Sequence, residues 1–178
     1  MKSVPHTTYA MRFAQAADEL RHHAPRLRLK PEAPTTGWVD GAWWPHSLDL
    51  SAELPSLLPA LTARLGRIER VTYHLAGWPP IPRRLRSGDE HGDIRLEGFR
   101  SQHPATLTVI GAWHRLTLLV IPPAADPDLA HHALMTAARR GNDDSVDTLL
   151  TTLEEDTAMR RWEVEGGRIP LQAEPVDA

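Results

Sequence analysis

The order of the predicted elements indicates an α+β fold, with a mostly antiparallel sheet of about five to seven strands and helices packed on one face. Two observations lead to this prediction. The predicted strands cluster in the middle of the chain, with one helix inserted early and a pair of helices at the end. The sequence also has neither an internal repeat nor the regular alternation of strands and helices that produces a parallel sheet.

The chain has 178 residues, which suits one domain that can bury a core without disulfides or metals. It has no cysteine, which excludes thiolate sites and fits a reducing compartment. Residues 1–20 lack the apolar run of a signal peptide, and the longest strongly apolar run, Leu116 to Ile121, has the length of a strand. The sequence therefore predicts a cytoplasmic protein without a membrane span.

One domain is expected over residues 25–160. Residues 1–24 carry apolar side chains near helical spacing, and we expect an arm or a weak helix that Pro25 ends. Beyond Trp162 the composition becomes polar, so residues 161–178 are expected to be a disordered tail.

Two strands are predicted first. The residues of 26–30 alternate strictly between arginine or lysine and leucine, as in a short strand. The tryptophan-rich segment 37–45 follows as a second strand, on which Gly41 could mark a bulge that resets the alternation. Without that reset the segment has two faces, with Trp38, Asp40, Ala42 and Trp44 on one and Val39 and Trp43 on the other.

The next segment has a leucine stripe at helical spacing, from Leu54 to Leu65, and is predicted to be a helix. Asp49 or Ser51 caps its start, and Gly66 ends it. Pro59 is unfavourable inside a helix and predicts either a kink or a later start.

The remaining strands are predicted at residues 70–75, 84–86, 93–99, 106–110 and 115–121. The last of these is apolar on both faces and is expected in the middle of the sheet. Asp126 followed by Pro127 opens a helix that reaches about Arg140. Asp143 or Asp144 is expected to cap the final helix.

Four segments carry a family resemblance: Arg28-Leu29-Lys30-Pro31, Gly37 to Pro45, Gly98-Phe99-Arg100-Ser101-Gln102 and Leu116 to Pro123. With these segments the chain resembles the DUF5994 family, small actinobacterial proteins of unknown function, over roughly Arg26 to Leu150. The resemblance implies no activity, ligand or catalytic residue. The family more often has Arg in place of His46 and Asn in place of His74, so a role for either histidine would not be a family role.

The tryptophans suggest a binding site. Each has a large apolar area and one N–H donor, so several together can form the floor of a pocket or anchor an interface. The candidate ligand- or partner-binding residues are Trp38, Asp40, Trp43, Trp44, His46, Trp78 and Arg100. The alternative is that these rings are packed in the core and at the sheet edge. Neighbours on a strand face opposite sides, so only one of Trp43 and Trp44 belongs to a given surface.

Polar residues near the strand ends offer a second interpretation. A histidine and a carboxylate within hydrogen-bond reach can transfer protons, so a small hydrolase or acid–base enzyme would use Asp40, His46, His74 and Arg100. The sequence has no recognisable nucleophile motif, however. Solvated polar residues at sheet edges are the commoner explanation, and the balance is against an enzyme.

The basic segment Arg83–Arg86 is a third candidate. If its strand pairs with that of Arg95, an arginine patch beside Trp78 and including Arg100 could contact RNA, DNA or a phosphoprotein. Edge strands need charges in any case, because charges prevent aggregation. The net charge of the chain is −3, which disfavours a nucleic-acid partner.

No metal and no cofactor are expected. Among the ten histidines, His22-His23 and His131-His132 are adjacent pairs whose side chains diverge on a helix, and no glycine-rich nucleotide motif occurs. The preferred interpretation is a non-catalytic ligand- or protein-binding or regulatory domain that uses its tryptophan-containing surface. Its partner would be a protein or a small molecule, and the sequence leaves the oligomeric state open.

Overall fold

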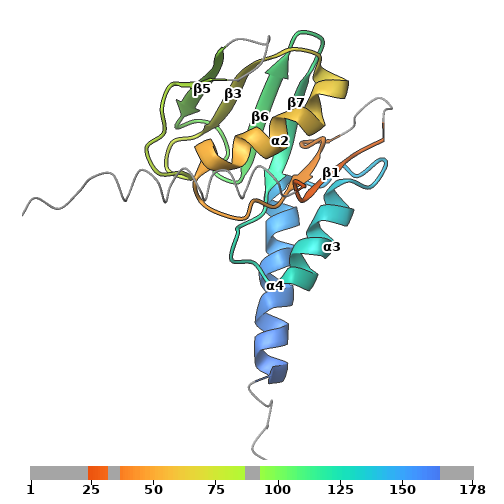
Figure 1. Cartoon of the computed structure of the whole chain (residues 1–178). Helices are drawn as coiled ribbons and strands as arrows, with labels where there is room; N and C mark the ends of the chain where they lie inside the picture. Colours follow the sequence, from red (N-terminus) through yellow and green to blue (C-terminus); the bar gives the residue numbers. More distant parts are fainter. Residues whose placement is uncertain (1–23, 32–36, 87–92, 165–178) are drawn as a thin grey trace, which may run out of the picture.

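Seven strands and three helices make up the computed structural model, which describes residues 24–31, 37–86 and 93–164. The strands are β1 (Leu27–Leu29), β2 (Gly41–Trp43), β3 (Ile68–His74), β4 (Arg84–Arg86), β5 (Asp93–Phe99), β6 (Thr106–Gly111) and β7 (Arg115–Val120). The helices are α2 (Leu50–Leu65), α3 (Pro127–Ala137) and α4 (Val146–Val164). Helix α2 lies across the sheet, and α3 and α4 lie side by side at one end of it (Figure 1).

The strands form one sheet in the order β1-β2-β7-β6-β3-β5-β4. The α+β prediction is confirmed, and the number of strands lies within the predicted range. The sheet is mixed rather than mostly antiparallel, because β2 runs parallel to β7 and β3 runs parallel to β5. Strands that follow each other through a short hairpin loop run antiparallel. In both parallel pairs other elements lie between the two strands in the chain, so no hairpin loop connects them.

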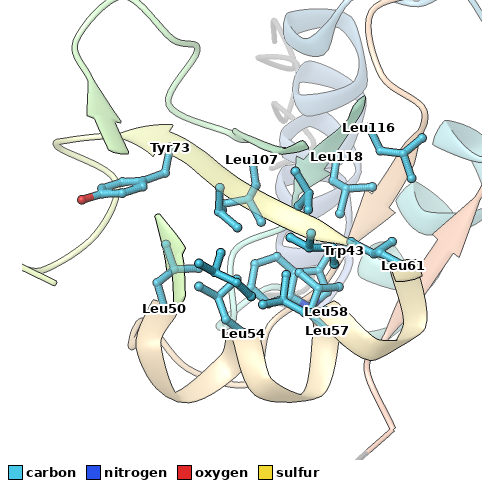
Figure 2. Close-up of a cluster of buried hydrophobic side chains, with 14 of the residues drawn as sticks. Trp43, Leu50, Leu54, Leu57, Leu58, Leu61, Tyr73, Leu107, Leu116 and Leu118 are labelled. Atoms are coloured by element: carbon cyan, nitrogen blue, oxygen red, sulfur yellow. The ribbon is translucent and has the colours of Figure 1, made fainter. Parts of the chain in front are cut away.

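Helix α2 and the strand faces beneath it form the larger apolar core (Figure 2). As predicted, Asp49 caps the helix by accepting a hydrogen bond from the Ala52 N–H, and Gly66 ends it at φ +69°. The helix begins at Leu50, so Pro59, whose ring is exposed, does not delay its start. The buried side chains of the helix include Leu50, Leu54, Leu57, Leu58, Leu61 and Leu65.

A second apolar cluster lies on the opposite face, where α3 and α4 pack against β2 and the end of β7. Strand β7 contributes to both clusters, because Leu118 belongs to the core under α2 and Leu119 to the second cluster. It is a central strand, as predicted. A strand that is apolar on both sides needs cover on both sides, so the helices do not all pack on one face as the sequence analysis expected.

The two C-terminal helices begin close to where the sequence predicted. Asp126 caps α3, which ends at Ala137 rather than near Arg140. Helix α4 is capped by Ser145, whose hydroxyl accepts a hydrogen bond from the Thr148 N–H at 3.1 Å. The prediction that Asp143 or Asp144 caps it is wrong by one or two residues, because the serine stands directly before the first helical residue.

Two predicted segments lie mainly outside the described residues. Of the arm at residues 1–24 the structure describes Ala24 alone, and of the tail at residues 161–178 it describes residues 161–164, which continue α4. Within the described ranges, no helix combines the length and the apolar character that crossing a bilayer requires.

Candidate functional site

Asp40 holds the tryptophan-rich segment onto the sheet. Its N–H donates to the Thr117 carbonyl at 2.7 Å, and its carboxylate Oδ2 accepts from the Thr117 N–H, also at 2.7 Å. The next residue, Gly41, lies so close to β1 that an added Cβ would clash with the Arg28 carbonyl. Since Val39 and Ala42 both belong to the second cluster while Trp43 belongs to the first, the alternation is reset at this point as the sequence suggested. Asp40 is thus occupied by a structural hydrogen bond.

The tryptophans lie in different surroundings. Trp43 is only 1% exposed and stacks on the buried Trp78, with ring centroids 6.0 Å apart. Trp44 points to the other side, where its Nε1 donates to the Pro122 carbonyl at 3.1 Å. Trp38 is 70% exposed. The prediction that Trp43 and Trp44 face opposite sides is confirmed, and two of the four candidate rings are part of the core.

A cluster of charged groups lies beside Trp44. The Arg26 guanidinium is stacked over the Trp44 ring at 3.5 Å and donates to the backbone carbonyls of Trp44 and Pro45. Burial lowers the pKa of Arg26, and the nearby charge of Glu53 opposes that effect. Glu53 is 1% exposed and lies 3.6 Å from His46 Nδ1. These groups link the start of β1 to the first turn of α2.

The acid–base candidates are not brought together. Asp40 and His46 flank β2, whereas His74 ends β3 and Arg100 follows β5, and strands β7 and β6 lie between the two groups. His74 Nδ1 accepts a hydrogen bond from the Ala76 N–H at 3.1 Å, and Arg100 is exposed. Within the described residues, no cluster of three or more histidine, aspartate or glutamate side chains has the arrangement of a metal site.

A different surface of the sheet has a coherent composition. Along β3 to β7, residues that alternate with the core residues under α2 point to the other side of the sheet. Where α3 and α4 do not cover that side, none of these residues is buried. We call these residues the open face. They are Arg70, Thr72, His74, Arg84, Arg86, Asp93, Arg95, Glu97, Phe99, Thr108, Ile110, Arg115 and Thr117.

Four arginines of the open face lie at one level of the sheet. The register pairs Arg84 with Arg95, Arg95 with Arg70, Arg70 with Ile110, and Ile110 with Arg115. Paired positions share a face, so these residues form one line across five neighbouring strands. We call the four arginines of that line the arginine row. Neighbouring strands lie about 4.8 Å apart, which makes the row about 19 Å long.

The charges of the open face are unbalanced. It carries five arginines and two carboxylates, Asp93 and Glu97, and a third carboxylate, the exposed Glu69, stands at the bulge beside Arg70, in a chain whose net charge is −3. Arg70 Nη1 lies 3.3 Å from Glu97 Oε2, and the side chains of Arg70 and Glu97 are 40% and 34% exposed. Like charges directly opposite each other on neighbouring strands destabilise a sheet. The two arginine pairings around Arg95 are therefore unfavourable, and the ion pair of Arg70 with Glu97 offsets part of that effect.

Sequence reasoning identified part of this row. It required that the strand of Arg84 pair with that of Arg95, and the structure has this pairing. Trp78 is not beside the patch, because its ring is buried in the core under α2, and Arg100 lies beyond the end of β5. The alternation that exposes Arg70 and Arg115 is visible in the sequence, but only the strand order brings them into line with Arg95.

Comparisons with known proteins identify the family but no function. The model of the DUF5994 family of unknown function matches residues 26–137, more than half of the chain. It begins at the residue where the sequence resemblance begins and ends before Leu150. No curated protein and no solved structure matches the chain. On the strength of the family match, this chain belongs to the DUF5994 family of unknown function.

Proposed function

We propose that this protein is a non-catalytic binding domain that holds a phosphate-bearing polyanion on its open face. The observation that carries the proposal is the arginine row, in which Arg84, Arg95 and Arg70 occupy paired positions on three adjacent strands. A guanidinium presents five N–H donors in a planar fork that matches phosphate. A line of such groups suits a ligand with regularly repeated negative charges.

The row exceeds what protection of a sheet edge requires. Arg84 lies on β4, the last strand of the sheet, where a charge prevents pairing with another chain. Arg95, Arg70 and Arg115 lie on strands that have a neighbour on both sides, where edge protection has no role. The direct pairing of Arg95 with Arg84 and with Arg70 is unfavourable, and residues that break a local rule in this way are typical of functional sites.

The proposal keeps the binding domain that the sequence suggested, but it places the binding surface on the open face instead of around the tryptophans. Trp43 and Trp78 are in the core, and Asp40 already accepts a backbone hydrogen bond, so the tryptophan-containing surface offers a partner little beyond Trp38 and the edge of Trp44. The acid–base residues lie apart, and no observation favours catalysis. The cytoplasm, which the sequence suggested as the compartment, contains many phosphate-bearing polyanions.

Titration calorimetry with inorganic polyphosphate at low salt tests the proposal. We expect binding that weakens steeply with salt, and about 10-fold weaker binding by a double variant, Arg84→Gln with Arg95→Gln. Loss of two phosphate contacts should also reduce the slope of log K against log salt by about 1.5. The matched control is Arg139→Gln with Arg140→Gln, which removes two exposed arginines outside the open face. The proposal fails if the wild type does not bind, or if the control pair loses as much affinity.

A further inference from the structure

We infer that the polyanion is a single-stranded nucleic acid whose phosphates follow the arginine row and one of whose bases stacks on Phe99. This inference rests on the proposed function and adds the class of ligand. Phe99 is the last residue of β5, is 44% exposed, and lies on the same face as Arg95 and Glu97 of that strand. The open face therefore presents an aromatic residue whose Cα lies about 13 Å along the strand from that of Arg95, at ~3.3 Å per residue.

His74 forms a second part of this aromatic end. It is paired directly with Phe99 across β3 and β5, so the two rings are neighbours on the open face. The Ala76 N–H donates to His74 Nδ1 at 3.1 Å, which ties the imidazole to its own turn. A base has a flat π-face whatever its identity, and stacking on aromatic side chains is the main sequence-tolerant contact of proteins with single strands.

The residues between the arginine row and Phe99 suit bases and sugars better than phosphates. This middle level consists of Glu97, Thr72, Thr108 and Thr117, which are paired with one another across four strands. The hydroxyls of Thr108 and Thr117 lie 3.1 Å apart and can both donate and accept. The Glu97 carboxylate, whose Oε2 already lies 3.3 Å from Arg70 Nη1, repels phosphate and has further lone pairs that can accept a hydrogen bond from the amino group of cytosine. A plain polyphosphate would gain nothing from this level, whereas a nucleic acid has groups that match it.

The dimensions of the face also fit a single strand. A row of about 19 Å has room for several successive phosphates of an extended strand. The bases of a duplex are stacked on each other and turned inward, so a duplex cannot place a base on Phe99 without opening. The geometry of the face thus favours an unpaired strand.

Fluorescence anisotropy with three labelled probes tests the inference: a ten-residue thymidine oligonucleotide, an abasic strand of the same length, and the duplex of the oligonucleotide. We expect the wild type to bind the oligonucleotide about 10-fold more tightly than the abasic strand, because only the first has bases to stack. Phe99→Leu should remove this difference and leave the binding of the abasic strand and of polyphosphate unchanged. Phe99→Tyr, the matched control, should retain it.

A second variant examines the middle level. Glu97→Gln keeps the size of the side chain and removes the charge, so binding of polyphosphate should become tighter while the preference for a cytidine over a thymidine oligonucleotide becomes smaller. Both variants affect exposed or half-exposed side chains, and unchanged thermal unfolding midpoints would verify that they fold.

The outcomes separate the two proposals. If polyphosphate binds and the abasic strand binds as well as the oligonucleotide, with no effect of Phe99→Leu, the ligand is a simple polyanion and the nucleic-acid inference is overturned. Tighter binding of the duplex, or equal binding of polyglutamate, would overturn it as well. If none of these polyanions binds at low salt, the open face is not an anion-binding surface and the proposed function fails with it.

Discussion

The two faces of strands β3 to β7 are built from alternate residues of the same segments, yet they obey different constraints. On the face under α2, Val71 is paired with Leu96, and both are buried. One residue earlier along each strand, Arg70 is paired with Arg95. Packing dictates the first pair, because any polar replacement there would be buried without a partner. Nothing in the fold requires the second pair to be arginine, so the open face is where the sequence had freedom to encode a function.

The largest effect is expected on the face under α2. Leu96→Ala should lower the free energy of unfolding by about 2–5 kcal/mol, because it leaves a cavity against α2 in a close-packed core. Urea denaturation followed by tryptophan fluorescence would measure the change. A loss below about 1 kcal/mol would mean that this face is less well packed than the buried cluster indicates.

The second prediction concerns how stability depends on pH. Tyr73 lies on the buried face, next to Thr72 of the open face. Burial raises the pKa of Tyr73 above the ordinary value of 10.0. As the pH rises past 10.0, the unfolded chain releases the phenol proton first, so the free energy of unfolding is constant for this group below that pH and falls above it. The chain has two tyrosines, so the phenolate absorbance of a Tyr9→Phe variant reports Tyr73 alone. Titration of that variant at or below the ordinary value would contradict the burial.

A smaller effect of opposite sign is expected on the open face. Arg95→Glu replaces two repulsive pairings, with Arg84 and Arg70, by attractive ones, and should raise the free energy of unfolding by about 0.5–1 kcal/mol. The same substitution lowers the charge of the row by two, as the double Arg84→Gln and Arg95→Gln variant does, and should also weaken polyphosphate binding about 10-fold. Arg139→Glu, at an exposed site after α3, serves as the comparison and should change stability by less than about 0.5 kcal/mol. Destabilisation by Arg95→Glu would show that the arginine row is not a source of strain.

The elements of this fold were largely predictable because they depend on local patterns. Asp49 and Gly66 mark the ends of α2, and the opposed directions of Trp43 and Trp44 follow from the pleat of a strand. The parallel pairing of β3 with β5 was not predictable, since it depends on contacts far apart in the chain. The same limit applies to function. A tryptophan in a pocket and one in a core have the same sequence pattern, and the arginine row becomes visible only once β4, β5, β3, β6 and β7 are set in order.

The parallel pairing of β3 and β5 places the three-residue strand β4 at the rim of the sheet, where its only strand partner is β5. A short rim strand of this kind opens and closes more readily than the centre of a sheet. A ligand lying along the arginine row would reach from Arg84 on this rim to Arg115 on the central strand β7. A bound ligand would then hold β4 onto the rest of the sheet. Amide protons of β4 should exchange with solvent more slowly in the bound protein, and only the intact sheet could bind the ligand. At a hundredfold excess over Kd this linkage alone would add about 2.7 kcal/mol to the free energy of unfolding.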